Sequence, residues 1–190
     1  MLIMYFKKFP FKYFLFLLFT IAQILIFVFL SSSAAIRTVT GTVTKVSDGD
    51  TIQLITPEQT KLKVRLYGID APETDKISSR TGQVNIPGQL YGDESQKALE
   101  NKIMGKQVKV DIIDIDKYRR MVAMIWLNDR NINLEMAREG YAEAFIEYLK
   151  EPYKSEFLRA EQEAKSAKKG IWSLAEYERP RDFRKRLKVK

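Results

Sequence analysis

The sequence of 190 residues contains neither cysteine nor histidine. Because these two side chains provide most thiolate nucleophiles, most bases that act near neutral pH and most zinc ligands, their absence excludes large classes of enzymes and metal sites. Any chemistry therefore has to use carboxylates, arginine, lysine, tyrosine, serine or a hard metal ion. The content of 45% hydrophobic and 29% charged residues is typical of one globular domain with appendages.

The formal net charge of +8 is concentrated at the two ends of the chain. Lys7, Lys8 and Lys12 lie in the first segment, and residues 179–190 carry seven basic side chains and one acidic one. The section between them is close to neutral, so attraction for phosphate there needs a local cluster and a bound cation. The basic C-terminal tail, residues 175–190, either adds salt-sensitive affinity for nucleic acid or is a solvated, disordered end, and both interpretations stay open.

A long apolar segment follows the first lysines. It runs from Tyr13 to Leu30, and no charge appears between Lys12 and Arg37. A bilayer core of ~30 Å takes roughly 20 helical residues, so this segment is long enough to span it as a hydrophobic helix. Small residues follow at the spacing of a cleavage site. We expect residues 1–35 to be either a membrane anchor or a cleaved signal peptide, with the remainder outside the cytoplasm.

Alternating, β-branched stretches separated by turn residues predict antiparallel strands after this segment. The expected strands span residues 37–46, 51–55, 61–67, 107–113 and 120–127. A turn at residues 114–119 joins the last two. Five strands suffice for a small barrel.

Caps and glycines predict three helices. Asp93 stands three residues before Gln96 and opens a helix that ends at Gly105. Asn133 opens a short second helix, and a third has Pro152 in its first turn and runs to about residue 169. The resulting fold class is α+β, mainly β: a five-stranded OB-fold barrel with three attached helices, over residues 36–174. Such barrels bind oligonucleotides on a strand face.

Three short segments could carry chemistry. Ser47-Asp48-Gly49-Asp50-Thr51 alone is explained as a hairpin turn, since Asp-Gly supplies the positive φ that such turns need. Asp116-Lys117-Tyr118-Arg119-Arg120 alone is explained as a polar hairpin tip.

The segment from Arg65 to Glu73 is more unusual, because a strand there ends in two carboxylates, Asp70 and Glu73, on a loop stiffened by Pro72. Carboxylates and a main-chain carbonyl are the ligands that a hard cation such as Ca²⁺ requires. Solvated acids at a strand end are the alternative.

Together and in this order, the three segments resemble the staphylococcal nuclease (thermonuclease) family, with its pattern DGDT, then R-x-x-x-x-D-x-P-E, then D-x-Y-x-R. The resemblance extends from about Thr38 to Ser173. It implies a calcium-dependent endonuclease acting on DNA and RNA, with one Ca²⁺. No protein partner is indicated by the sequence, and we expect a monomer. The residues it assigns are the metal ligands Asp50, Asp70 and the carbonyl of Ala71; the catalytic Arg65, Glu73 and Arg120; and the substrate-binding Lys117, Tyr118 and Tyr148.

These assignments also agree with the chemistry of phosphodiester cleavage. Charge builds up on a five-coordinate phosphorus, which a cation and two guanidiniums such as Arg65 and Arg120 can neutralise. Glu73 near the metal can position or deprotonate the attacking water. Aromatic rings such as Tyr118 and Tyr148 stack on bases with little regard to sequence.

The sequence departs from the family pattern in several places. Arg119 stands where a glycine usually precedes the last catalytic arginine, and Met121 replaces a second glycine. Because positive φ is unfavourable for arginine, the turn could be reshaped and the orientation of Arg120 altered. Ile146 replaces a substrate-facing tyrosine, and the surface loop at residues 74–90 is longer than in the prototype.

Two other classes of function compete with the enzyme. The first is a non-catalytic nucleic-acid-binding module on the same barrel, tethered to the membrane, since fold does not imply activity. The second is a membrane-tethered adaptor with a basic tail, which explains the two ends of the chain and leaves the acids and arginines unexplained. Binding-only modules lose acids or arginines, whereas Asp50, Asp70, Glu73, Arg65 and Arg120 are all present.

Overall fold

The computed structural model describes residues 37–188. Its strands are β1 (Arg37–Asp48), β2 (Thr51–Ile55), β3 (Lys61–Leu66), β4 (Ile69–Asp70), β5 (Lys76–Ile77), β6 (Val84–Ile86), β7 (Gln107–Ile115), β8 (Met121–Leu127), β9 (Arg130–Asn131) and β10 (Glu143–Ala144). Its α-helices are α2 (Gly92–Ile103), α3 (Ile132–Arg138), α4 (Tyr153–Ser166) and α5 (Pro180–Lys188). Two 3-10 helices, η2 (Ile146–Tyr148) and η3 (Gly170–Ser173), flank α4.

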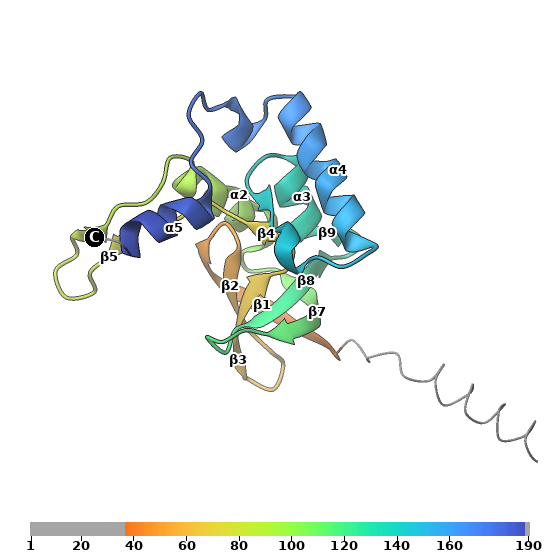
Figure 1. Cartoon of the computed structure of the whole chain (residues 1–190). Coiled ribbons are helices and arrows are strands. Elements are labelled where there is room, and N and C mark those ends of the chain that lie inside the picture. Colours follow the sequence, from red (N-terminus) through yellow and green to blue (C-terminus); the bar gives the residue numbers. More distant parts are fainter. Residues whose placement is uncertain (1–36, 189–190) are drawn as a thin grey trace, which may run out of the picture. The chain divides into compact units, whose positions relative to one another are not determined.

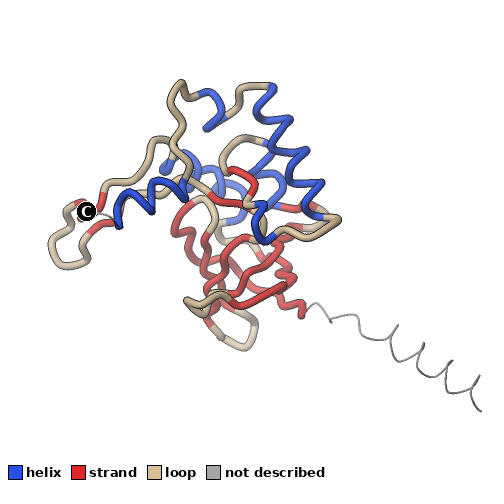
Figure 2. Tube along the Cα trace, viewed as in Figure 1, coloured by secondary structure: helices blue, strands red, loops and turns tan. Residues whose placement is uncertain are grey.

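Five of the strands close into a barrel. The sheet order is β3-β2-β1-β7-β8-β9, and β3 also pairs with β8. This closing pair is parallel, with Val64 opposite Met121 and Leu66 opposite Ala123, whereas the other pairs of the barrel are antiparallel. The strands occupy one half of the domain and α2, α3 and α4 the other (Figures 1 and 2). The predicted mainly β OB-type barrel with attached helices is confirmed.

The hydrophobic core lies inside the barrel and under the helices. The strands alternate buried and exposed positions where they face solvent, as the period of two requires. Large side chains that are buried to within 1% exposure come from both halves: Ile52, Leu54, Leu66, Leu99, Ile103, Ile125, Ile132, Met136 and Phe157. Burial of each such side chain stabilises the fold by roughly 1.5–3 kcal/mol.

The observed helix caps differ from the predicted ones. The residue before α2 is Tyr91, in the left-handed conformation with φ 71°, and no side chain caps this helix. Asp93 lies inside the first turn, where its charge still favours the positive end of the helix dipole. In α3 the cap is Asn131, whose side chain accepts the N–H of Leu134. Sequence spacing located these helices and missed their first residues by one or two positions.

Two segments outside the barrel contain regular structure. Within the loop at residues 74–90, β5 and β6 pair as a short hairpin. Within the basic C-terminal segment, α5 forms and buries Phe183 to 6% exposure. In Figure 1, α5 lies near β5 and away from α4. The C-terminal segment, whose composition indicated only a high positive charge, therefore contributes a helix, α5, to the folded domain.

The expected membrane anchor or signal peptide, residues 1–35, lies outside the described residues. Among residues 37–188, no helix combines the length and the hydropathy needed to cross a membrane.

Asn133 joins the barrel to the helices. Its side chain is 0% exposed, accepts the N–H of Ile125 (2.9 Å), and donates to the carbonyls of Tyr67 (2.9 Å) and Ala123 (2.9 Å). These partners lie on or next to β3 and β8, the two strands of the closing pair. The side chain therefore fixes α3 against the closing pair of the barrel.

Replacing Asn133 with leucine is expected to lower the free energy of unfolding by about 2–4 kcal/mol. The reason is that buried main-chain groups lose their partner, at roughly 1–3 kcal/mol for each unmade hydrogen bond. Urea unfolding followed by circular dichroism measures the difference. Asn101→Leu, at an exposed position of α2, is the matched control and should change stability by no more than about 0.5 kcal/mol. Equal stability of the Asn133 variant and the wild type would contradict the role of this side chain.

Candidate active site

Four of the predicted site residues lie at the ends of neighbouring strands. Asp50 is in the turn from β1 to β2, Arg65 is in β3, Asp70 ends β4, and Glu73 follows in the next loop. The β2–β3 register places Thr51 opposite Arg65, so the turn and the arginine are adjacent. The chain direction of three strands therefore brings acids and a guanidinium to one place.

Gly49 lets this turn approach α2 closely. A Cβ at this position would lie 1.9 Å from Ser95 Oγ and 2.7 Å from Ala71 Cβ, which real atoms cannot do. Its φ is outside the left-handed region, so the prediction that the Asp48-Gly49 turn depends on positive φ is wrong. The glycine is needed for space, because Ser95 at the start of α2 packs directly against the turn.

Arg65 bridges the two predicted metal-binding carboxylates. Its Nη2 donates to Asp70 Oδ1 (2.8 Å), and its Nη1 pairs with Asp50. Asp50 also accepts the N–H of Ala71 (2.9 Å) and the hydroxyl of Thr51 (3.0 Å). Asp70 is 0% exposed and Asp50 6%. The site is thus a buried ion cluster at the rim of the barrel.

Burial and neighbouring charges shift the pKa values of three aspartates here. Burial, together with the charge of Asp50, raises the pKa of Asp48 to about 7. Burial also disfavours the charged form of Asp50, but Arg65 and the Ala71 N–H outweigh it and hold the pKa of Asp50 below its ordinary value. Burial raises the pKa of Asp70 in spite of the nearby guanidiniums. Such a cluster favours any cation that can approach it.

Glu73 joins the cluster through an arginine that sequence reasoning did not assign. Arg184, in α5, donates to Glu73 Oε1 (2.9 Å) and to both oxygens of Asp70 (3.0 and 2.7 Å). Lys76 also pairs with Glu73 (3.0 Å), and the Glu73 N–H donates to Gln89 (3.0 Å). The sequence contained one indication that an arginine of this segment could reach the acids, namely the basic character of the C-terminal segment.

The turn before β8 holds Arg120 in a different set of contacts. Asp116 accepts the N–H groups of Tyr118 and Arg120 (both 2.9 Å), and its other oxygen accepts Arg120 Nε (2.7 Å). Arg119 has φ 61°, so the left-handed turn is kept although arginine stands in place of glycine. The closing β3–β8 pair sets this turn beside the strand of Arg65. The guanidinium of Arg120 contacts Asp116 and not the buried aspartates.

The predicted substrate-binding residues are on the surface. Tyr118 is 65% exposed and Tyr148 68%. Lys117 Nζ lies 5.2 Å from the centre of the Tyr118 ring, and the Tyr148 ring packs against Phe145 with centroids 5.3 Å apart. Both tyrosine rings are therefore accessible to a base. Ile146, where the family pattern has a tyrosine, is 43% exposed.

The residues that could hold a metal ion are Asp50, Asp70 and the carbonyl of Ala71, all oxygen donors of the type that Ca²⁺ prefers. Among residues 37–188 no group of three or more acidic side chains forms a cation site, so two carboxylates would need carbonyl and water oxygens to complete a ligand shell. The donor set fits this role in its chemistry, because it consists of oxygen atoms only and includes two carboxylates. In the structure the guanidiniums of Arg65 and Arg184 are the cations that contact the fully buried Asp70.

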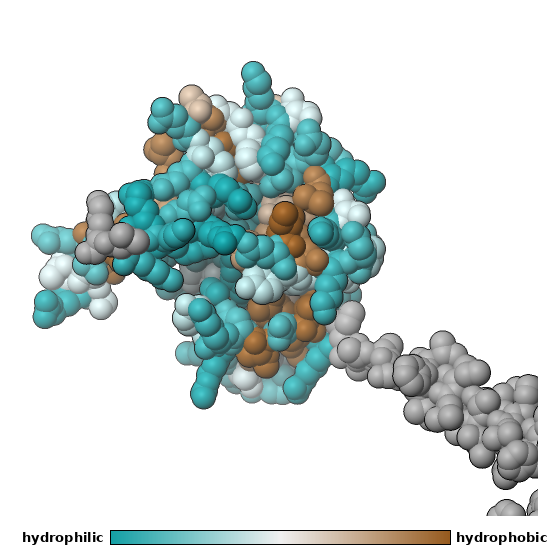
Figure 3. All heavy atoms as spheres, in the orientation of Figure 1, coloured by the Kyte–Doolittle hydropathy of each residue, from teal (hydrophilic) through white to brown (hydrophobic). Residues whose placement is uncertain are grey.

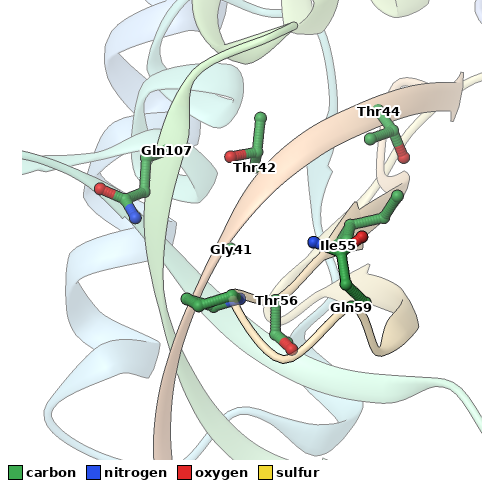
Figure 4. A pocket seen from close by; sticks show the side chains of 8 residues that line it. Gly41, Thr42, Thr44, Ile55, Thr56, Gln59 and Gln107 are labelled. Atoms are coloured by element: carbon green, nitrogen blue, oxygen red, sulfur yellow. The ribbon is translucent and has the colours of Figure 1, made fainter.

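A separate cavity lies beside the middle of β1 and the last residue of β2. Its volume is about 410 Å³. It is lined by Gly41, Thr42, Thr44, Ile55, Thr56, Pro57, Gln59 and Gln107 (Figure 4). None of these side chains is ionisable, so this cavity offers no group for acid–base or metal chemistry.

Comparison with known proteins gives consistent matches. A family model described as "Staphylococcal nuclease homologue" matches residues 63–174. The chain is 32% identical over 166 residues to a protein of Haemophilus influenzae named "Uncharacterized endonuclease", covering 87% of this chain and 84% of that protein.

Two further relatives extend the comparison. The chain is 33% identical over 146 residues to the thermonuclease of Staphylococcus intermedius, covering 76% of this chain and 82% of the thermonuclease. It is 38% identical over 125 residues to a rice protein (Oryza sativa subsp. japonica) named "Probable staphylococcal-like nuclease CAN3". That match covers 66% of this chain and 29% of the rice protein, so the chain spans less than a third of that relative.

Proposed function

Because this chain belongs to the staphylococcal nuclease family and is a nuclease, we propose that it hydrolyses phosphodiester bonds of DNA and RNA with the help of one Ca²⁺. The observation that carries the proposal is the convergence of Asp50, Asp70, Arg65 and Glu73 at the rim of the barrel. Two buried acids with an arginine between them fit a site that takes both a metal ion and a phosphate.

The proposed metal ligands are Asp50, Asp70 and the carbonyl of Ala71. Calcium bound there would polarise a phosphate oxygen as a Lewis acid. The protein holds the two carboxylates in fixed positions through the Ala71 N–H and the Thr51 hydroxyl on Asp50, and through Arg65 between the acids. This preorganisation means that the carboxylates themselves need little movement when a cation arrives.

Arg65, Arg120 and Glu73 are the proposed catalytic residues. The planar forks of the two arginines match phosphate oxygens and would neutralise charge that develops in the transition state. Arg120 has to turn from Asp116 toward the phosphate, and its 2.7 Å bond to that residue is a half-buried contact that a phosphate would have to replace. Glu73 would orient or deprotonate the attacking water.

Lys117, Tyr118 and Tyr148 are the proposed contacts to nucleotide. The two tyrosines expose most of their rings, so bases can stack on them, and such stacking contributes ~1–3 kcal/mol per base with little sequence preference. Lys117 lies beside the Tyr118 ring, where its charge can meet a phosphate. This arrangement suits a nuclease of broad substrate range.

Removal of calcium is expected to abolish cleavage, and its return to restore it. The measurement is digestion of labelled single- and double-stranded DNA and RNA by the purified chain, in excess chelator and in added Ca²⁺. Asp70→Asn, which leaves one metal-binding carboxylate uncharged, should need more Ca²⁺ for half-maximal rate than the wild type. Full activity in chelator would contradict the metal site, and binding of nucleic acid without any turnover would favour the non-catalytic module.

A further inference from the structure

The C-terminal helix α5 is docked on the same side of the domain as the proposed active site. Phe183 anchors it by burial to 6% exposure. Just before the helix, Arg179 forms a two-pronged contact with Glu143 (2.9 and 3.0 Å). Glu143 lies opposite Asp70 in the β10–β4 pair, so this anchor is next to the site. Figure 3 shows a hydrophilic surface over α5.

Arg184 is the residue of α5 that enters the site. It forms three hydrogen bonds, two with the oxygens of Asp70 and one with Glu73. Its side chain is 36% exposed, whereas Asp70 is fully buried, so the guanidinium covers the acids from the solvent side. Both acids have other positive partners: Arg65 contacts Asp70, and Lys76 contacts Glu73. Arg184 is therefore an additional cation on the acids.

A divalent cation and this guanidinium need the same oxygens. Asp70 has two oxygen atoms, and both accept hydrogen bonds from Arg184. A calcium ion bound by Asp70 would take at least one of them at about 2.3–2.6 Å, and it would then face the positively charged guanidinium at close range on the same carboxylate. Glu73, the proposed base, is bound by the same Arg184 nitrogen that contacts Asp70 Oδ1. A water that Glu73 activates would also need Glu73 Oε1, the oxygen that accepts the hydrogen bond from Arg184.

We propose that Arg184 is an internal competitor of the metal ion, through which α5 restrains the nuclease until calcium displaces it. This inference rests on the proposed calcium site at Asp50 and Asp70. The restrained state keeps the buried acids neutralised without metal, and the active state requires α5 to move away. Because the coupling of two binding events is reciprocal, calcium must weaken the docking of α5 by the factor by which α5 weakens calcium binding.

The first test is calcium binding measured by isothermal titration calorimetry on the full chain in detergent. Arg184→Gln is expected to bind Ca²⁺ on the order of 10-fold more tightly than the wild type, within the range usual for coupling between two sites. Arg186→Gln is the matched control: it removes the same charge from the same helix, but Arg186 pairs with Glu178 and not with the acids of the site. It should bind Ca²⁺ as the wild type does.

The outcomes of this titration separate the two proposals. Equal affinity of Arg184→Gln and the wild type would overturn the role of Arg184 and leave the calcium site standing. An equal gain in Arg184→Gln and Arg186→Gln would also overturn it, since the effect would then come from net charge. If neither the wild type nor the two variants bind calcium, the calcium site itself is overturned, and the proposed competition falls with it.

A second readout follows the helix directly. The chain has no cysteine, so Lys185→Cys, at an exposed position of α5, provides a single site for a nitroxide label. Saturating Ca²⁺ is expected to make the label more mobile in the electron paramagnetic resonance spectrum. In the Arg184→Gln background, the label should be mobile before calcium is added. An unchanged spectrum at saturating Ca²⁺ would overturn the displacement of α5.

Discussion

Replacing Glu73 with glutamine is expected to lower the rate of the chemical step by about 10²- to 10⁴-fold, the usual contribution of a positioned general base. The two side chains are nearly equal in size, so the change removes the negative charge and leaves the loop intact. Glu73 has its N–H bonded to Gln89, which holds the main chain independently of the carboxylate. The measurement is single-turnover cleavage of a labelled oligonucleotide at saturating Ca²⁺.

Glu163→Gln is the control for this substitution. Glu163 pairs with Arg138 on the surface of α4, away from the site, and its replacement should leave the rate unchanged. The affinity for oligonucleotide should stay close to that of the wild type in both variants, because the proposed role of Glu73 concerns the attacking water and not the nucleotide. A wild-type rate for Glu73→Gln would remove this residue from the mechanism.

Replacing Arg65 with lysine is expected to reduce kcat by about 10²- to 10³-fold, the size of effect seen when one charge-stabilising donor is lost. Lysine keeps the positive charge between Asp50 and Asp70, so the folded state keeps a counter-charge for its two buried acids. What it loses is the planar fork that can contact two oxygens at once. The loss should therefore appear in kcat more than in the affinity for substrate.

Arg130→Lys is the matched control for this change. Arg130 makes a two-pronged contact with a single carboxylate, that of Glu135 (2.7 and 2.6 Å), at a surface position outside the site. Its replacement should leave kcat unchanged. A rise in the substrate dissociation constant of Arg65→Lys with no change in kcat would instead assign Arg65 to substrate binding and remove it from the chemical step.

The barrel and its helices were predictable because the relevant signals are local. Alternation along 51–55 and 61–67 and the glycines after α2 and α3 reflect backbone geometry within a few residues. The helix starts were less predictable: Tyr91 adopts a left-handed conformation before α2, which no preference of tyrosine indicates. The packing of the surrounding fold determines the conformation of Tyr91, and the intrinsic propensity of tyrosine does not.

The site could be predicted only in part, for a related reason. Asp50, Arg65, Asp70 and Glu73 belong to short segments whose order and spacing match a known family pattern. Arg184 belongs to no such segment, and its contact with Asp70 depends on how α5 packs through Phe183. The turn at Arg119 is an intermediate case, since the sequence indicated a disturbed backbone and the structure keeps the left-handed conformation at the expense of some strain.

The closing pair of β3 and β8 also gives the site an order of assembly during folding. Asp50, Arg65 and Asp70 are close to one another in the sequence, so the contacts among them close only short loops. Arg120 comes to lie next to the strand of Arg65 only when β3 pairs with β8, where Val64 is opposite Met121. This pairing closes the long intervening chain, which includes α2 and β7. Contacts between residues distant in sequence form late because they cost more chain entropy. The acidic half of the site can therefore exist in a partly folded chain, whereas the second arginine depends on the completed barrel.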